Sequence, residues 1–142
     1  MSTIQLQVVS PDKLVCDKEI AMLIVRSVGG ELGILPKHAP LATGLIPHAM
    51  RIKIDGQEEQ LMAVAGGFME VTPTLITVLT SAAEEPENID VNRAQAAYAR
   101  AKQRVEAFKA APAQHEEIDI DRAEMALARA KARLIATHTS FN

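Results

Sequence analysis

The chain has 142 residues, of which 48% are hydrophobic, and its formal net charge at pH 7 is −3. This size and balance are typical of a soluble protein with one core of moderate size and a smaller appendage. The low aromatic content of 3%, without tryptophan, and the acidic balance argue against a nucleic-acid-binding protein.

The first 86 residues have the pattern of short strands. Apolar and polar residues alternate with period two in several runs, and glycine, proline or an Asp-Gly pair separates one run from the next. This pattern favours an antiparallel β-sandwich over a parallel sheet. The predicted strands are residues 4–8, 19–27, 51–54, 60–65, 68–71 and 75–80, with turns at 11–12, 55–56 and 72–74.

One segment of this first part, residues 30–41, is too apolar and too rich in glycine and proline for a plain linker. Proline fixes the backbone and glycine allows conformations that other residues avoid, so the segment predicts a loop of one specific conformation. Two interpretations are open, a loop that only closes the sandwich and a loop that contacts a partner.

Cys16 is the single cysteine, so no internal disulfide can form, and its strand-like surroundings predict a thiol in the core. Residues 1–3 lack the basic and apolar regions of a signal peptide, and we therefore expect an intracellular protein. The longest apolar run, residues 20–25, is far shorter than the roughly 20 residues that span a bilayer, so we expect no direct membrane insertion.

The sequence predicts neither a catalytic site nor a metal site. The glycine pairs at 29–30 and 66–67 lack the other residues of a phosphate-binding loop or a dinucleotide fingerprint. No nucleophile, base and orienting group stand together, so an enzyme is not expected. The histidines lack the spacing with cysteine or carboxylates that zinc needs, and they are His38, His48, His115 and His138.

Composition changes near residue 86. All seven glycines and six of the seven prolines lie before this point, whereas fifteen alanines follow it. Residues 1–86 carry six basic and ten acidic side chains, and residues 87–142 carry nine and eight. We therefore predict two units, a β-sandwich over residues 1–86 and a helical unit over residues 87–142, which makes the fold class α+β.

The second part contains a near-repeat of itself, because residues 89–105 and 118–134 are identical at ten of seventeen aligned positions. Each copy opens with an Asp that can cap a helix and continues with strong helix formers. The pattern predicts two helices that fold back as an antiparallel hairpin with a thin, alanine-rich seam. The apolar stripes are Ala94, Tyr98, Ala101, Val105 and Phe108 in the first helix and Ala123, Leu127, Ala130 and Leu134 in the second.

Arginines repeat at the same steps in both predicted helices. They stand at Arg93, Arg100 and Arg104 in the first copy and at Arg122, Arg129 and Arg133 in the second. Two interpretations are open: a solvated face that is screened by nearby carboxylates, or a site for an anion such as a phosphate.

Four stretches are specific when they are taken together. They read Val-Ser-Pro at 9–11, Gly-Glu-Leu-Gly-Ile-Leu-Pro-Lys-His-Ala-Pro-Leu at 30–41, Gly-Gly-Phe-Met-Glu-Val at 66–71 and Ile-Asp-Val-Asn-Arg-Ala at 89–94. With them, essentially the whole chain resembles the epsilon subunit of bacterial F-type ATP synthase, which is equivalent to the mitochondrial delta subunit. The resemblance implies a flattened N-terminal β-sandwich followed by a C-terminal helical hairpin.

The resemblance also implies a function and partners. Such a subunit is a non-catalytic part of the rotor central stalk, peripheral at the cytoplasmic face of the cell membrane, and it binds the gamma subunit and the polar loops of the c-ring. Its helices lie folded on the sandwich or extend toward the alpha and beta subunits, where they inhibit ATP hydrolysis. We expect Glu31 and His38 to contact gamma or the c-ring loops.

Some members of this family bind regulatory ATP on the folded hairpin. The matching motif here comprises Ile89, Asp90, Arg93 and Ala94, with Glu84 just ahead of it, and the matching second-helix arginines are Arg122, Arg129 and Arg133. No other cofactor is expected. Without the resemblance, a free-standing module that senses nucleotide is the alternative function, and co-purification with a membrane ATPase discriminates the two.

Overall fold

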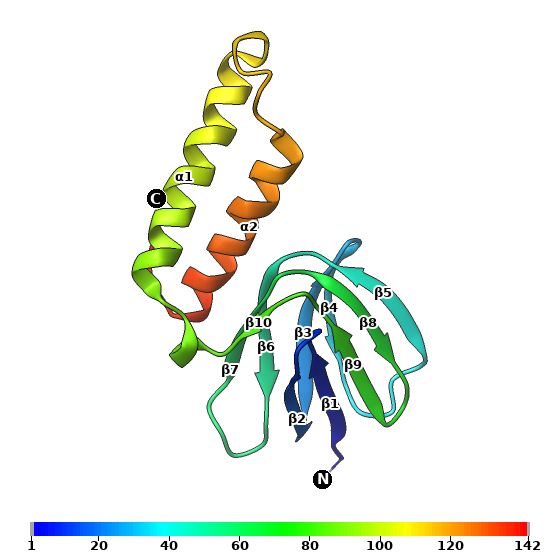
Figure 1. The fold of residues 1–142 in the computed structure, drawn as a ribbon. Helices are drawn as coiled ribbons and strands as arrows, with labels where there is room; N and C mark the ends of the chain where they lie inside the picture. Colours follow the sequence, from blue (N-terminus) through cyan, green and yellow to red (C-terminus); the bar gives the residue numbers. More distant parts are fainter. Residues whose placement is uncertain (1, 142) are drawn as a thin grey trace.

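The computed structural model describes residues 2–141, which form ten strands followed by a pair of helices (Figure 1). Two 3-10 helices, η1 (Pro86–Asn88) and η2 (Pro112–Gln114), precede the two α-helices, α1 (Val91–Ala110) and α2 (Ile120–Ala136). The strands are β1 (Ile4–Val9), β2 (Leu14–Ile20), β3 (Met22–Ser27), β4 (Gly30–Ile34), β5 (Leu41–Leu45), β6 (His48–Lys53), β7 (Gln60–Val64), β8 (Gly67–Val71), β9 (Leu75–Leu79) and β10 (Ala83–Glu84).

The strands form one sheet that curls around a shared core, in the order β10-β7-β6-β3-β5-β8-β9-β1-β2, with β4 added beside β3 (Figure 1). The predicted antiparallel sandwich is confirmed, with one difference in strand direction. Strands β1 and β9 pair in parallel, with Val8 opposite Val78. Period-two alternation reports which face of a strand is buried and carries no information on the direction of its neighbour, so the parallel ladder was not predicted.

Two predictions of local structure in the sandwich were wrong, one of a strand and one of a loop. Residues 19–27 are the end of β2 and all of β3, because the chain bends at Ala21, whose N–H donates to the carbonyl of Lys53 at 2.8 Å. The predicted loop 30–41 is a strand in its first half, since Gly30–Ile34 is β4, which pairs with β3. Glycines at 30 and 33 suggested a loop, but glycine also occurs in strands that pair on one side, as β4 does with β3.

The core takes the inward-facing residues of every long strand. Leu6, Leu23, Met50 and Met69 are fully buried there. Cys16 is buried among them, as predicted, and burial raises the pKa of its thiol. The sandwich is therefore closed by its own apolar side chains.

The two helices form the predicted antiparallel hairpin (Figure 1). Each begins at an Asp that caps it: the carboxylate of Asp90 accepts from the N–H of Arg93, and that of Asp119 accepts from the N–H of Arg122, both at 3.1 Å. Of the predicted stripes, only Phe108 and Leu127 are less than fully buried. In the described part of the chain, no helix is both long and apolar enough to cross a bilayer.

Helix α2 also packs on the sandwich, a second contact that the pattern did not predict. It lies against β6 and β7, where Ala63 joins the same buried cluster as Ala132, Leu134 and Ala136. The hairpin is thus folded onto the outside of the sheet, with α2 covered by α1 on one side and by strands on the other.

Candidate functional site on the arginine face of the hairpin

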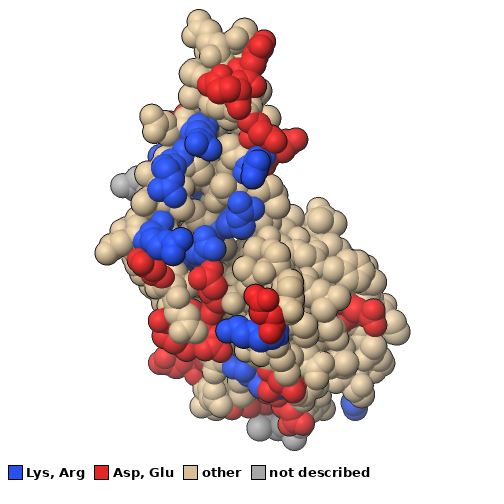
Figure 2. Space-filling view, in the orientation of Figure 1, with Lys and Arg blue, Asp and Glu red and all other residues tan. Residues whose placement is uncertain are grey.

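Lysine and arginine side chains gather over one face of the two helices, as Figure 2 shows. The cause is the repeat: in each helix three arginines stand at i, i+7 and i+11, close to whole numbers of turns, so they share one side of the helix. Because the helices are antiparallel copies joined as a hairpin, the two rows face the same groove between them.

The half of this groove nearer the sandwich is a hollow of about 490 Å³. It forms where the start of α1 approaches β10 and the last turns of α2. Its polar lining comes from both parts of the chain and comprises Glu84, Asn88, Asp90, Arg93, Arg100 and Arg133.

The other half is a hollow of about 620 Å³ farther along the helices. Its charged lining comprises Arg100, Arg104, Glu117, Asp119, Arg122 and Arg129. Ala97 and Arg100 line both halves, so the two hollows adjoin, and we call them together the arginine groove. Its combined size is suitable for a ligand as large as a nucleotide.

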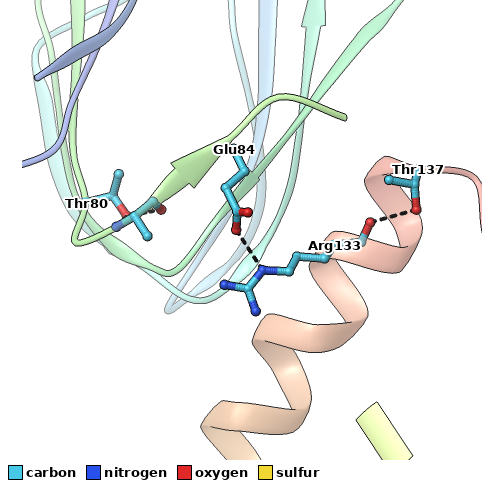
Figure 3. Close-up of polar contacts among 5 residues, drawn as sticks. Thr80, Glu84, Arg133 and Thr137 are labelled. Atoms are coloured by element: carbon cyan, nitrogen blue, oxygen red, sulfur yellow. Dashed lines mark hydrogen bonds and ion pairs between the residues drawn. The ribbon is translucent and has the colours of Figure 1, made fainter. Parts of the chain in front are cut away.

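Glu84 on β10 and Arg133 on α2 form an ion pair in the half of the groove nearer the sandwich. The Nε–H of Arg133 donates to Oε1 of Glu84 at 2.7 Å, and both side chains are about one-third exposed (Figure 3). Glu84 lies opposite Ala63 on the neighbouring strand β7, so its side chain is on the side of the sheet that α2 covers. The pair therefore links α2 directly to the sandwich.

The other groove arginines are not neutralised in this way. Within residues 2–141, Arg133 has a carboxylate within 4 Å. The other arginines of the two rows have none within that distance, and they are Arg93, Arg100, Arg104, Arg122 and Arg129. Several guanidinium groups facing one depression attract anions with more than one negative charge, because each can donate two parallel hydrogen bonds to a phosphate. Glu84, Asp90, Glu117 and Asp119 line the same groove, so both interpretations of the arginine rows, an anion site and a face screened by carboxylates, stay predictions.

A second surface feature is an exposed apolar patch on the sandwich, made of Val28, Phe68 and Leu79. Phe68 and Leu79 are direct cross-strand partners on β8 and β9, and Gly44 on β5 is the partner of Phe68 on its other side. The Val28 side chain lies over Gly44. These three residues are 44–72% exposed, so nothing in the described part of the chain covers the patch.

Family models and relatives identify the chain. The model of the ATP synthase delta/epsilon chain β-sandwich domain matches residues 3–86, and that of the delta/epsilon chain long alpha-helix domain matches residues 87–137. The ATP synthase epsilon chain of Alkalihalophilus pseudofirmus is 52% identical over 109 residues, which is 77% of this chain and 81% of that one. The chain belongs to the ATP synthase delta/epsilon family. A second relative, the epsilon chain of Bacillus subtilis, is 47% identical over 107 residues, or 75% of this chain and 80% of that one.

Solved structures share the fold at low sequence identity. A chain of the Euglena gracilis mitochondrial ATP synthase OSCP/F1/c-ring assembly superposes with a TM-score of 0.78 at 21% identity, covering 97% of this chain and 82% of that one. A chain of the Tetrahymena thermophila mitochondrial ATP synthase central stalk and c-ring gives 0.58 at 11% identity, covering 94% and 96%. They confirm the predicted fold class, and the family models and the curated relatives show the delta/epsilon family.

With the delta/epsilon family assigned, the residues matched to its ATP motif can be located. Glu84, Asp90, Arg93, Ala94 and Arg133 line the half of the groove near the sandwich, while Arg122 and Arg129 line the far half. Ile89 lines neither half and is buried in the apolar cluster beneath the hairpin. Asp90 also caps α1, so part of the motif has a structural role.

The anion-site interpretation of this delta/epsilon chain included Arg100 and Arg104, but the residues matched to the ATP motif did not, and Asn88 was in neither set; all three line the groove. The signal for the two arginines was present, since they belong to the same repeated stripe as Arg93. Asn88 carried no signal, because it enters the groove only through the position of η1 beside α1.

The two residues expected to touch other subunits lie on different segments. Glu31 is on β4, where its carboxylate pairs with Arg26 at 3.4 Å and is more than half exposed. His38 lies in the connection from β4 to β5, where Nδ1 donates to the carbonyl of Ala39 at 2.7 Å. The apolar patch was missed, although Phe68 shares its strand face with Glu70 and Leu79 shares its face with Thr77, positions that alternation assigns to solvent.

Proposed function

We propose that this chain is a non-catalytic subunit of the central stalk of an F-type ATP synthase, held peripherally at the cytoplasmic face of the membrane. Its relatives are named ATP synthase epsilon chains, and its structural neighbours come from F1/c-ring and central-stalk assemblies. In this role the sandwich binds the gamma subunit and the polar loops of the c-ring. The subunit transmits rotation and carries out no chemistry of its own.

The sandwich surface supports this role by its chemistry. Val28, Phe68 and Leu79 offer an apolar surface of the kind that lies at the centre of stable protein interfaces, and Glu31 and His38 are polar side chains on the segment 30–41. We assign the patch to gamma, and Glu31 and His38 to gamma or the c-ring loops. A cysteine at position 31 should crosslink to a c subunit in the assembled enzyme, and labelling by solvent reagents alone would contradict this contact.

The hairpin is proposed to restrain ATP hydrolysis when it opens and extends toward the alpha and beta subunits. Its seam is rich in alanine, and a buried Ala contributes much less than the roughly 1.5–3 kcal/mol of a buried Leu or Val. The same helix faces can therefore be buried in another arrangement at similar free energy, which makes the hairpin a two-state element.

ATP is proposed to bind in the arginine groove and to favour the folded hairpin. The observation that carries this proposal is that the groove takes arginines from both helices, so its cations converge only while the helices lie together. ATP at about a hundredfold above its dissociation constant adds roughly 2.7 kcal/mol to the folded state. Inverting a 1:99 population needs about 5.5 kcal/mol, so ATP shifts the balance without determining it alone.

The test is calorimetric titration of ATP into the isolated chain and into single variants. Arg93→Ala, Arg100→Ala and Arg122→Ala should each weaken binding by tenfold or more, at about 1.4 kcal/mol per factor of ten. Arg51→Ala is the matched control, because Arg51 is on the sandwich and pairs with Glu59 at 3.0 Å. No binding to the parent chain at millimolar ATP would remove the nucleotide part of the proposal.

Inhibition is tested separately in the assembled ATP synthase. Enzyme carrying a subunit that ends at residue 86 should hydrolyse ATP faster than enzyme with the full chain, and the ratio of the two rates should increase as ATP is lowered. Unchanged hydrolysis would remove the inhibitory part, and failure of the chain to co-purify with the membrane ATPase would favour a free-standing nucleotide sensor.

A further inference from the structure

The chain after α2 turns back sharply toward α1. The N–H of Thr139 donates to the carbonyl of Leu134 at 2.8 Å, and the N–H of His138 donates to that of Ile135 at 3.0 Å. These two bonds form a Schellman motif, whose central residue must adopt the left-handed conformation. His138 does so with φ of 54°, although glycine is the usual residue there.

This turn brings Phe141 onto Tyr98 of α1. The ring centroids are 5.1 Å apart and the ring planes are inclined by 59°, an arrangement within the favourable range for aromatic pairs. Lys102 places Nζ 5.8 Å from the centroid of the same Tyr98 ring. Only 8% of Tyr98 is exposed, so its ring is enclosed by the hairpin and the tail together.

The contact between Phe141 and Tyr98 links α2 to α1 toward the end of the hairpin where no connecting segment joins the helices. The connection through η2 joins the helices covalently at one end, whereas at the other end the start of α1 and the end of α2 are separate segments (Figure 1). Phe141 and Tyr98 can meet only while α2 lies along α1. In a hairpin whose seam is rich in alanine, the Phe141–Tyr98 pair adds an apolar contact larger than an alanine can make.

We propose that residues 137–141 are a latch that holds the hairpin closed, and that Phe141 must leave Tyr98 before α2 separates from α1. The proposal rests on the proposed function in that hairpin opening is the inhibitory step. The latch contact itself is a property of the isolated chain and can be tested without the enzyme.

The experiment is hydrogen exchange of the α2 amides in the isolated full chain, compared with Phe141→Ala and with Phe68→Ala as the matched control. Phe68 is on the sandwich and similarly exposed, at 44% against 36% for Phe141. Loss of an aromatic pair should speed exchange of residues 126–134 by about two- to tenfold. The control should leave these amides unchanged.

A second measurement observes the contact directly. The parent chain should show a nuclear Overhauser effect between the rings of Phe141 and Tyr98, and its absence would overturn the latch. Equal α2 exchange in the parent and Phe141→Ala would also overturn it. If exchange accelerates while ATP hydrolysis by enzyme carrying Phe141→Ala is unchanged, the latch stands and the inhibitory role of the hairpin fails.

Discussion

Arg133 and Glu84 are 49 positions apart in the chain and 2.7 Å apart in space, and their ion pair joins α2 to the short strand β10. Near the pair, the hydroxyl of Thr80 donates to the carbonyl of Ala82 at 3.0 Å and shapes the chain just before β10. The hydroxyl of Thr137 donates to the carbonyl of Arg133 at 3.0 Å at the end of α2 (Figure 3). A local hydrogen bond thus orders the segment that carries each partner of the ion pair.

We predict a measurable coupling free energy between Arg133 and Glu84. Because both side chains are about one-third exposed, the coupling should be about 0.5–1 kcal/mol, in the range of partly solvated ion pairs. The measurement is a double-mutant cycle of Arg133→Gln and Glu84→Gln by urea unfolding. The coupling should fall at 1 M salt, and a strictly additive cycle would contradict the ion pair.

We predict that the two helix caps differ in function although their geometry is the same. Asp119→Ala should lower the free energy of unfolding by about 1 kcal/mol, because the N–H of Arg122 loses its acceptor. Asp119→Asn should lose much less, since Asn also caps. Asp90→Asn should likewise leave the thermal unfolding temperature unchanged, but it should weaken ATP binding. Unchanged ATP affinity would mean that Asp90 caps α1 and has no part in ATP binding.

We predict that protonation of His48 destabilises the sandwich. The ring is buried, its Nδ1–H donates to the carbonyl of Ile46 at 2.6 Å, and its Nε2 accepts from the N–H of Arg26 at 3.1 Å. Burial lowers the pKa of His48 from its ordinary 6.5, and a proton on Nε2 would face the Arg26 N–H.

The sign of the pH effect follows from this lowered pKa. Between the native pKa and 6.5 the unfolded chain binds more protons than the folded one, so stability is present above 6.5 and falls as the pH falls through this window. The slope for one proton cannot exceed about 1.4 kcal/mol per pH unit. Urea unfolding of the parent and His48→Gln as a function of pH measures it, and equal slopes would contradict the prediction.

We predict that Gly67 cannot be replaced by alanine without large damage. A Cβ there would lie 2.0 Å from the carbonyl oxygen of Leu79. Gly56→Ala is the control, because Gly56 also has positive φ but has open space around it, and its cost should be only about 1–2 kcal/mol. Chemical unfolding compares the two, and equal losses would mean that the backbone conformation, not the contact with Leu79, sets the cost.

We propose that residues 1–86 fold without the helices, and we predict a β-rich, cooperatively unfolding chain that ends at residue 86. Its stability should be lower than that of the full chain, because removing α2 exposes the side of β6 and β7 that carries Ala49, Leu61 and Ala63. Circular dichroism and urea unfolding test this. A chain without a cooperative transition would mean that α2 belongs to the core of the sandwich.

The helices were the most predictable part of the fold, because a 17-residue repeat with an Asp near the start of each copy encodes where each helix begins and which stripe is buried. Strands with clear alternation, such as β1 and β8, were also found. The bend at Ala21 and the pairing of β4 were not, since a short apolar run reads alike as one strand, two strands or a loop.

The sequence predicted the two arginine rows of the candidate site, but it did not predict the groove that they line. Arg100 lies at the centre of the depression only because the hairpin places it between both halves. The packing of α2 on the sheet was hidden for a different reason: Ala132 and Ala136 are small, and alanine is equally common on exposed helix faces. Nonlocal contacts made by small side chains leave little trace in a sequence.

The parallel ladder between β1 and β9 has a consequence for biosynthesis. Of the ten strands, β1 is made first, and among the described residues it pairs only with β2 and with β9, which follows about seventy residues later. The hairpin β1–β2 must therefore wait, with Leu6 and Val8 uncovered, until residue 79 has left the ribosome. A ribosome paused before that point would hold an incomplete sheet with an open edge, and chaperones should bind the nascent chain most strongly during that interval.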